Sequence, residues 1–106
     1  MIDWGRVTEL RTEFGEDGFA EVVGLFLEEA DEVIARLDLG VPPEQVEGQL
    51  HFLKGSALNL GLTDLAALCQ DGERRAAQGG VDLARVVSCY AASKAAFQAG
   101  AGQAAA

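Results

Sequence analysis

Apolar residues recur at intervals of three and four along most of the chain, which is the period of an amphipathic helix. The pattern predicts five helices and no strand. The first is short: Asp3 can cap it, and it ends near Phe14 because Gly15 can adopt the conformation that closes a helix. The second covers roughly residues 17–37. Its apolar stripe consists of Phe19, Val22, Val23, Phe26, Ala30, Val33, Ile34 and Leu37.

Proline and glycine separate the second helix from the third. Gly40 and Pro42 break the chain, and Pro43 can open the next helix because the first turn needs no N–H group from proline. The third helix then runs over about residues 43–60 and ends at Gly61.

Capping residues set the start of the last two helices. Thr63 is the expected N-cap of the fourth helix, which Gly79 and Gly80 close, and Asp82 is the expected N-cap of the fifth. The apolar stripes are Leu65, Leu68, Cys69 and Ala76 in the fourth helix, and Leu83, Val86, Val87, Tyr90 and Phe97 in the fifth. The end of the chain holds only alanine, glycine and glutamine, so we expect residues 100–106 to fray.

The loops between these helices are short, and short loops make neighbouring helices antiparallel. We therefore predict an all-α fold, an antiparallel up-down-up-down four-helix bundle with a short extra N-terminal helix. The chain has 106 residues, enough for one core, and shows no repeat or linker. Residues 1–106 are expected to form a single domain.

Charge argues against nucleic acid as a partner. The chain holds 8 basic and 17 acidic residues, a net charge of −9, whereas a protein that binds a phosphate backbone needs a basic face. No apolar run is long enough to span a membrane, and Asp3 and Arg6 interrupt any secretory leader. We expect a cytoplasmic protein that makes no membrane contact, although so short a chain can also be part of a longer protein.

Metal binding is not expected either. Cys69 and Cys89 lie far apart in apolar surroundings, which is typical of small core residues. A structural zinc site needs four ligands, and the chain offers two cysteines and a single histidine, His51. No cofactor motif is present.

The helical period predicts that His51 faces solvent. At about 100° per residue, the apolar stripe of its helix lies roughly 140° away from the imidazole at its centre. That stripe is formed by Val46, Leu50, Leu53, Ala57 and Leu60. A lone histidine is more often buried, but here the period points outward.

Small and charged residues share the face of His51. Gly48 and Gly55 fall within about 60° of it and remove side chains around the ring, although each weakens the helix. Lys54 lies one helical turn away, close enough for its ammonium group to reach an anion on the ring. Phe52 and Leu58 flank the same face, where they either form a docking surface for a partner or are half-buried.

A longer motif contains these residues. The segment HFLKGSALNLGLTDLAALCQDGE, from His51 to Glu73, resembles the histidine-containing phosphotransfer domain of two-component phosphorelays. The matching positions, in register, are His51, Lys54, Gly55, Ser56, Leu60, Gly61, Leu65, Leu68 and Cys69. The motif covers about a fifth of the chain and is specific as a whole, whereas His-x-x-Lys-Gly alone would be a weak signal.

The resemblance implies that His51 accepts a phosphoryl group on a ring nitrogen, usually Nε2. The group comes from the aspartate of a receiver domain, in a response regulator or a hybrid histidine kinase, and leaves for another. Lys54 would steady the phosphoryl oxygens, and Gly55 would give the receiver access. Family members often carry glutamine where this chain has Glu73, whose carboxylate could accept the Nδ1 proton in a hydrogen bond but would repel the phosphoryl oxygens.

The expected protein is thus a phosphocarrier, not an enzyme, and a monomer with transient partners. Gly48, Phe52, Leu58 and Glu73 are the expected partner-binding residues. Autophosphorylation from ATP is not expected, because the chain lacks Gly-x-x-x-x-Gly-Lys-Ser/Thr.

Two other functions compete with phosphotransfer. An adaptor bundle could dock a receiver or kinase without carrying phosphate, and the acidic Glu44, Glu47 and Glu73 favour it. A hydrolase or metalloenzyme of the bundle class is the weaker alternative, since Glu-x-x-His ligand pairs are missing.

Overall fold

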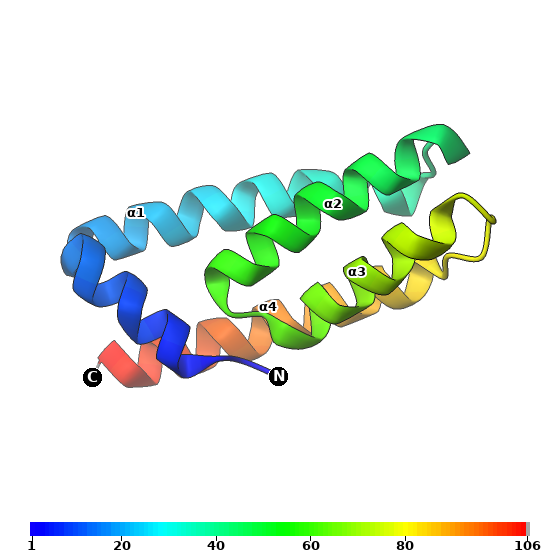
Figure 1. Ribbon diagram of the computed structural model, residues 1–106. Coiled ribbons are helices and arrows are strands. Elements are labelled where there is room, and N and C mark those ends of the chain that lie inside the picture. Colours follow the sequence, from blue (N-terminus) through cyan, green and yellow to red (C-terminus); the bar gives the residue numbers. More distant parts are fainter. Residues whose placement is uncertain (106) are drawn as a thin grey trace.

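The computed structural model describes the backbone of residues 1–105 and the side chains of residues 1–100. It contains four helices, α1 (Trp4–Leu39), α2 (Pro43–Leu60), α3 (Thr63–Ala76) and α4 (Leu83–Ala105). Each helix packs against the next along the chain, and α4 returns to α1, which closes an antiparallel bundle (Figure 1). The predicted all-α bundle is confirmed.

The short N-terminal helix forms one bent element with the long helix that follows it. Gly15 alone departs from helical geometry inside α1, with φ 72° and ψ 169°. A residue with a side chain rarely adopts such a positive φ, so glycine permits the bend. The predicted break at Gly15 is confirmed, and residues 4–14 form an arm that crosses the end of the bundle (Figure 1).

The arm packs against the far end of α4 through an aromatic stack. The Trp4 and Phe97 rings lie 6.2 Å apart between centroids, with 18° between their planes. Gly100 makes room for the indole, because a Cβ at this position would lie 2.2 Å from a Trp4 ring carbon.

Residues 1–3, which precede α1, also hydrogen-bond to the turn between α2 and α3. The Asp3 amide donates to the Gly61 carbonyl at 2.8 Å, and the Thr63 amide and hydroxyl both donate to the Met1 carbonyl, at 3.1 and 2.9 Å. The prediction that Thr63 caps α3 is therefore wrong. Thr63 is the first helical residue, and the Met1 carbonyl accepts from its amide, one of the amides at the start of α3 that have no partner within the helix.

Two other predicted caps are confirmed. Asp3 Oδ1 accepts from the Arg6 amide at 3.2 Å at the start of α1. Asp82 Oδ1 accepts from the Arg85 amide at 3.1 Å at the start of α4. The backbone of α4 is helical to Ala105, across the stretch where the sequence predicts fraying, and Ala106 lies outside the described residues.

The core contains the predicted stripes with some changes. Leu27 is buried although the predicted stripe of its helix omits it, while Phe26 packs only partly against the core. Cys69 is fully buried, and burial raises the pKa of its thiol to about 12. Cys89 is half-buried, and both thiols are free. None of the described helices combines the length and apolar character needed to cross a membrane.

A polar contact joins α1 to α4 at the rim of this core. The Tyr90 hydroxyl donates to Asp31, and Lys94 Nζ lies 2.9 Å from Asp31 Oδ2. Burial alone would raise the pKa of Asp31, but the hydrogen bonds from Tyr90 and Lys94 and the charge of Lys94 outweigh it and hold that pKa below its ordinary value. Burial, with the adjacent carboxylate, raises the pKa of Tyr90.

The depressed pKa of Asp31 predicts a pH-dependent contribution to stability. The contact stabilises the fold above the ordinary carboxyl pKa and loses its effect as the pH falls through the lower, folded-state pKa. Because Asp31 is 46% exposed, Asp31→Asn should lower the free energy of unfolding at pH 7 by no more than about 1 kcal/mol. Urea denaturation at pH 7 and at pH 3 measures this, and a gap that widens in acid would refute the assignment.

The turn at Gly61 predicts a larger effect on stability. Gly61 has φ 79°, and a Cβ there would lie 2.7 Å from the Asp3 carbonyl oxygen, so Gly61→Ala combines strain with a clash. We expect a loss of about 2 kcal/mol. Gly24→Ala is the control: nothing lies within 4 Å of a Cβ there, and alanine should stabilise the helix by about 0.5–1 kcal/mol. Equal denaturation midpoints for the two variants would contradict this account.

Candidate phosphoacceptor site

The exposed face of α2 carries His51. Its side chain is 73% exposed, as the helical period predicts. The opposite side of the helix is buried by the predicted stripe of Val46, Leu50, Leu53, Ala57 and Leu60. The ring is therefore accessible to another macromolecule.

A carboxylate from the neighbouring helix holds this ring. Glu73, on α3, places Oε1 3.0 Å from His51 Nδ1 and Oε2 3.0 Å from Lys54 Nζ. The Glu73 and Lys54 side chains are only 15% and 22% exposed. One carboxylate thus bridges the imidazole and the ammonium group, and its position is fixed by both.

The bridge determines which ring nitrogen can react. A carboxylate only accepts hydrogen bonds, so in the neutral ring Nδ1 carries the proton and Nε2 keeps its lone pair. A partner on one ring nitrogen sets the tautomer in this way at many metal and catalytic histidines. In the neutral ring, Nε2 is therefore the nitrogen with the free lone pair.

Lys54 also offsets the repulsion that the Glu73 carboxylate would exert on an anion beside His51. An isolated carboxylate beside the ring would repel an incoming phosphoryl group, but the ammonium group at 3.0 Å compensates its charge. From the sequence, Lys54 is expected to direct its ammonium group at an anion on the ring. In the structure its ammonium group binds Glu73, and its contact with phosphoryl oxygens stays a prediction.

The two glycines leave space beside the ring. Apart from the chain neighbours and the backbone of α2 itself, no described atom lies within 4 Å of where a Cβ would stand at Gly48 or Gly55, so this surface is open. Phe52 and Leu58 are 45% and 58% exposed, so neither is a core residue, and both exposures fit half-burial as well as a docking surface. Their role in docking stays a prediction.

Sequence reasoning missed the Lys54–Glu73 ion pair. Both residues are identified as candidates from the sequence, and their helices are predicted neighbours. The register of α2 against α3 decides the pairing, however, and periodicity within one helix does not supply it. For the contact of Glu73 with His51, 22 positions apart, the family resemblance supplies the signal, and the structure contains this contact at 3.0 Å.

A family model matches most of the chain, including the helices that carry the site. The model described as "Hpt domain" matches residues 21–99, which include α2, α3 and every candidate site residue. The chain belongs to the Hpt domain family. The N-terminal arm lies before the part of this Hpt domain that the family model matches.

One curated relative is similar to part of the chain. The chain is 32% identical over 75 residues to the phosphorelay intermediate protein YPD1 of Candida albicans, covering 66% of this chain. The chain spans about two fifths of the length of that relative, 41%. No solved structure matches the chain.

Removing the carboxylate should change the tautomer of His51. In wild type we expect the neutral ring to carry its proton on Nδ1, because Glu73 accepts it. In Glu73→Ala the Nε2-protonated form should become the major one, while Glu73→Gln, whose amide oxygen can still accept, should keep the wild-type tautomer. Nitrogen-15 chemical shifts of the ring at a pH where it is neutral report this. An Nε2-protonated ring in wild type would contradict the proposed bridge.

Proposed function

We propose that this Hpt domain carries a phosphoryl group on Nε2 of His51, taking it from the aspartate of a receiver domain and passing it to another. The single observation that carries the proposal is the geometry of the ring: exposed on one side and held at Nδ1 by Glu73 at 3.0 Å on the other. Such a ring presents an unprotonated, nucleophilic nitrogen to a visiting protein.

The transfer needs no acid or base from this chain. The Nε2 lone pair attacks phosphorus in line, the N–P bond forms, the bond from phosphorus to the aspartyl oxygen breaks, and the carboxylate leaves with the electron pair. Positive charge develops on the ring during attack, and the Glu73 carboxylate at Nδ1 balances it. Onward transfer is the same sequence in reverse. The domain therefore acts as a phosphocarrier rather than an enzyme.

Lys54 supplies charge compensation in this scheme. Its ammonium group is one turn along α2 from His51 and pairs with Glu73 in the unphosphorylated domain. A phosphoryl group on Nε2 adds negative charge beside it, and a flexible ammonium group with three donors can serve the carboxylate and a phosphoryl oxygen together. Gly48 and Gly55 leave the receiver room to approach, and Phe52 and Leu58 offer it apolar contact.

The proposal predicts that label transfer depends on His51 alone. Incubation with a phosphorylated receiver domain should label wild type, with the acid-labile and base-stable behaviour of phosphohistidine, and should leave His51→Gln unlabelled. His51→Gln should fold normally, because the side chain is 73% exposed and lies outside the core. Equal labelling of the two proteins would reject phosphotransfer through His51. Receiver binding without any label transfer would support the adaptor function instead.

A further inference from the structure

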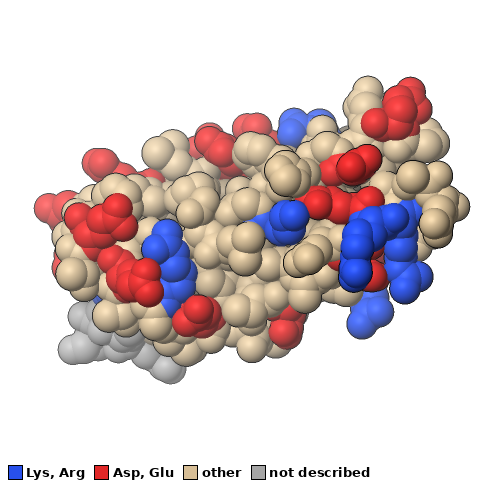
Figure 2. Space-filling view, in the orientation of Figure 1, with Lys and Arg blue, Asp and Glu red and all other residues tan. Residues whose placement is uncertain are grey.

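Three arginines gather where α3 ends and α4 begins. Arg74 and Arg75 lie in the last turn of α3, and Arg85 lies in the first turn of α4. We call these three residues the arginine corner. Figure 2 shows basic side chains grouped over this end of the molecule, whereas acidic side chains dominate over α1. On a chain with 17 acidic and 8 basic residues, the corner is a local reversal of charge.

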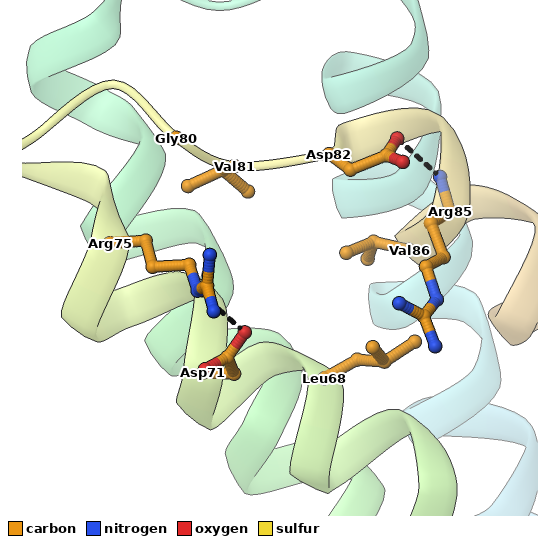
Figure 3. A pocket seen from close by; sticks show the side chains of 9 residues that line it. Leu68, Asp71, Arg75, Gly80, Val81, Asp82, Arg85 and Val86 are labelled. Carbon is orange, nitrogen blue, oxygen red and sulfur yellow. Dashed lines mark hydrogen bonds and ion pairs between the residues drawn. The ribbon is translucent and has the colours of Figure 1, made fainter.

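A hollow between the two helices separates these arginines. Arg75 stands on the α3 side and Arg85 on the α4 side (Figure 3). Apolar side chains lie between them, and the full lining is Leu68, Asp71, Gly72, Arg75, Gly80, Val81, Asp82, Arg85 and Val86. A group entering the hollow would therefore meet guanidinium groups, two carboxylates and apolar side chains.

Nearby carboxylates neutralise the corner only in part. Asp71 serves two arginines at once, with Arg74 Nη2 at 3.3 Å and Arg75 Nε at 2.9 Å. Asp82 accepts a hydrogen bond from the Arg85 amide and so caps α4. The Arg85 guanidinium itself has no ion-pair partner among residues 1–100, and five N–H donors are available there.

We propose that the arginine corner is a docking surface for an acidic face of the protein partner that exchanges phosphoryl groups with His51. The carboxylate of an aspartate or glutamate on the partner enters the hollow and binds the Arg85 guanidinium. The methylene groups of that partner side chain contact Leu68 and Val86. The inference rests on the proposed function, since it identifies what orients the partner on this domain.

The position of the corner suits this role. Arg74 directly follows Glu73, the residue that holds the His51 ring, so the corner begins one residue along α3 from the site. A protein interface of ordinary size extends over such a separation. Charges at the rim of an interface act mainly on the rate and orientation of encounter. An acidic partner is repelled by the surface of α1 and attracted at the corner, and this asymmetry turns it toward His51.

Charge reversal at Arg85 tests the proposal. Arg85→Glu should preserve the fold, because a carboxylate in the first turn of a helix is favourable. With a phosphorylated receiver as donor, we expect its kcat/KM to fall about fivefold or more at low salt. The difference should disappear near 0.5 M salt, where charges are screened over a few ångströms. Labelling of His51 by phosphoramidate, a small donor that needs no docking, should equal that of wild type.

Arg36→Glu is the matched control. It makes the same change in net charge at an exposed position on α1, where Arg36 Nε donates to Gln49 Oε1 at 3.4 Å, and it should reduce kcat/KM by less than about twofold. Equal losses for the two variants would show a general charge effect and overturn the proposal. A kcat/KM of Arg85→Glu equal to that of wild type would also overturn the proposal. So would binding of labelled single-stranded DNA to wild type that disappears in Arg85→Glu, because the corner would then bind nucleic acid.

Failure of the proposed function gives a different result. If His51 accepts no phosphoryl group from phosphoramidate or from a receiver, phosphotransfer is rejected. Receiver binding, measured by titration at low salt, then tests the corner directly. A weaker complex for Arg85→Glu but not for Arg36→Glu would support the corner, and equal affinities would overturn it.

Discussion

The site depends on the close approach of α2 and α3. Gly72 lies where the two helices meet, and a Cβ there would stand 2.7 Å from Leu50 Cδ1. Because this position has no side chain, α3 can lie close enough for the next residue, Glu73, to reach His51 and Lys54 on α2. With a wider separation of α2 and α3, Glu73 would reach neither Nδ1 of His51 nor the ammonium group of Lys54. Nothing would then hold the ring in the tautomer that leaves the lone pair on Nε2.

The N-terminal arm secures this pair of helices from outside. Within the arm, Arg6 Nε donates to the Asn59 carbonyl at 3.1 Å near the end of α2, and Asp3, just before the arm, hydrogen-bonds to the turn at Gly61. The arm also stacks on α4 through Trp4. The arm lies outside the matched family segment, residues 21–99, yet it contacts the turn that sets the angle between the two site-bearing helices. Packing at one end of the bundle therefore supports the geometry of a site further along α2.

Much of the fold follows from local physical chemistry that a single sequence displays. The period of the apolar residues predicts the stripe of α2 and hence the exposure of His51, and Gly15, Gly40 and Gly61 mark the helix ends because each adopts a positive φ. Interactions between distant segments are harder to predict. Thr63 has the residue type of a cap, but the Met1 carbonyl satisfies the start of α3 instead. The Glu73–Lys54 pair likewise depends on helix register. Leu27 is buried through the way α1 packs on its neighbours.

We propose that the Glu73 carboxylate keeps the proton on Nδ1 of His51 and so leaves the Nε2 lone pair free to react. The most direct test is to phosphorylate the domain and determine, from phosphorus–nitrogen and phosphorus–proton couplings in the NMR spectrum, which atom carries the phosphoryl group. The account predicts a single adduct on Nε2 of His51, with the proton still on the Nδ1 side that faces Glu73. A phosphoryl group on Nδ1, or on any other residue, would contradict it.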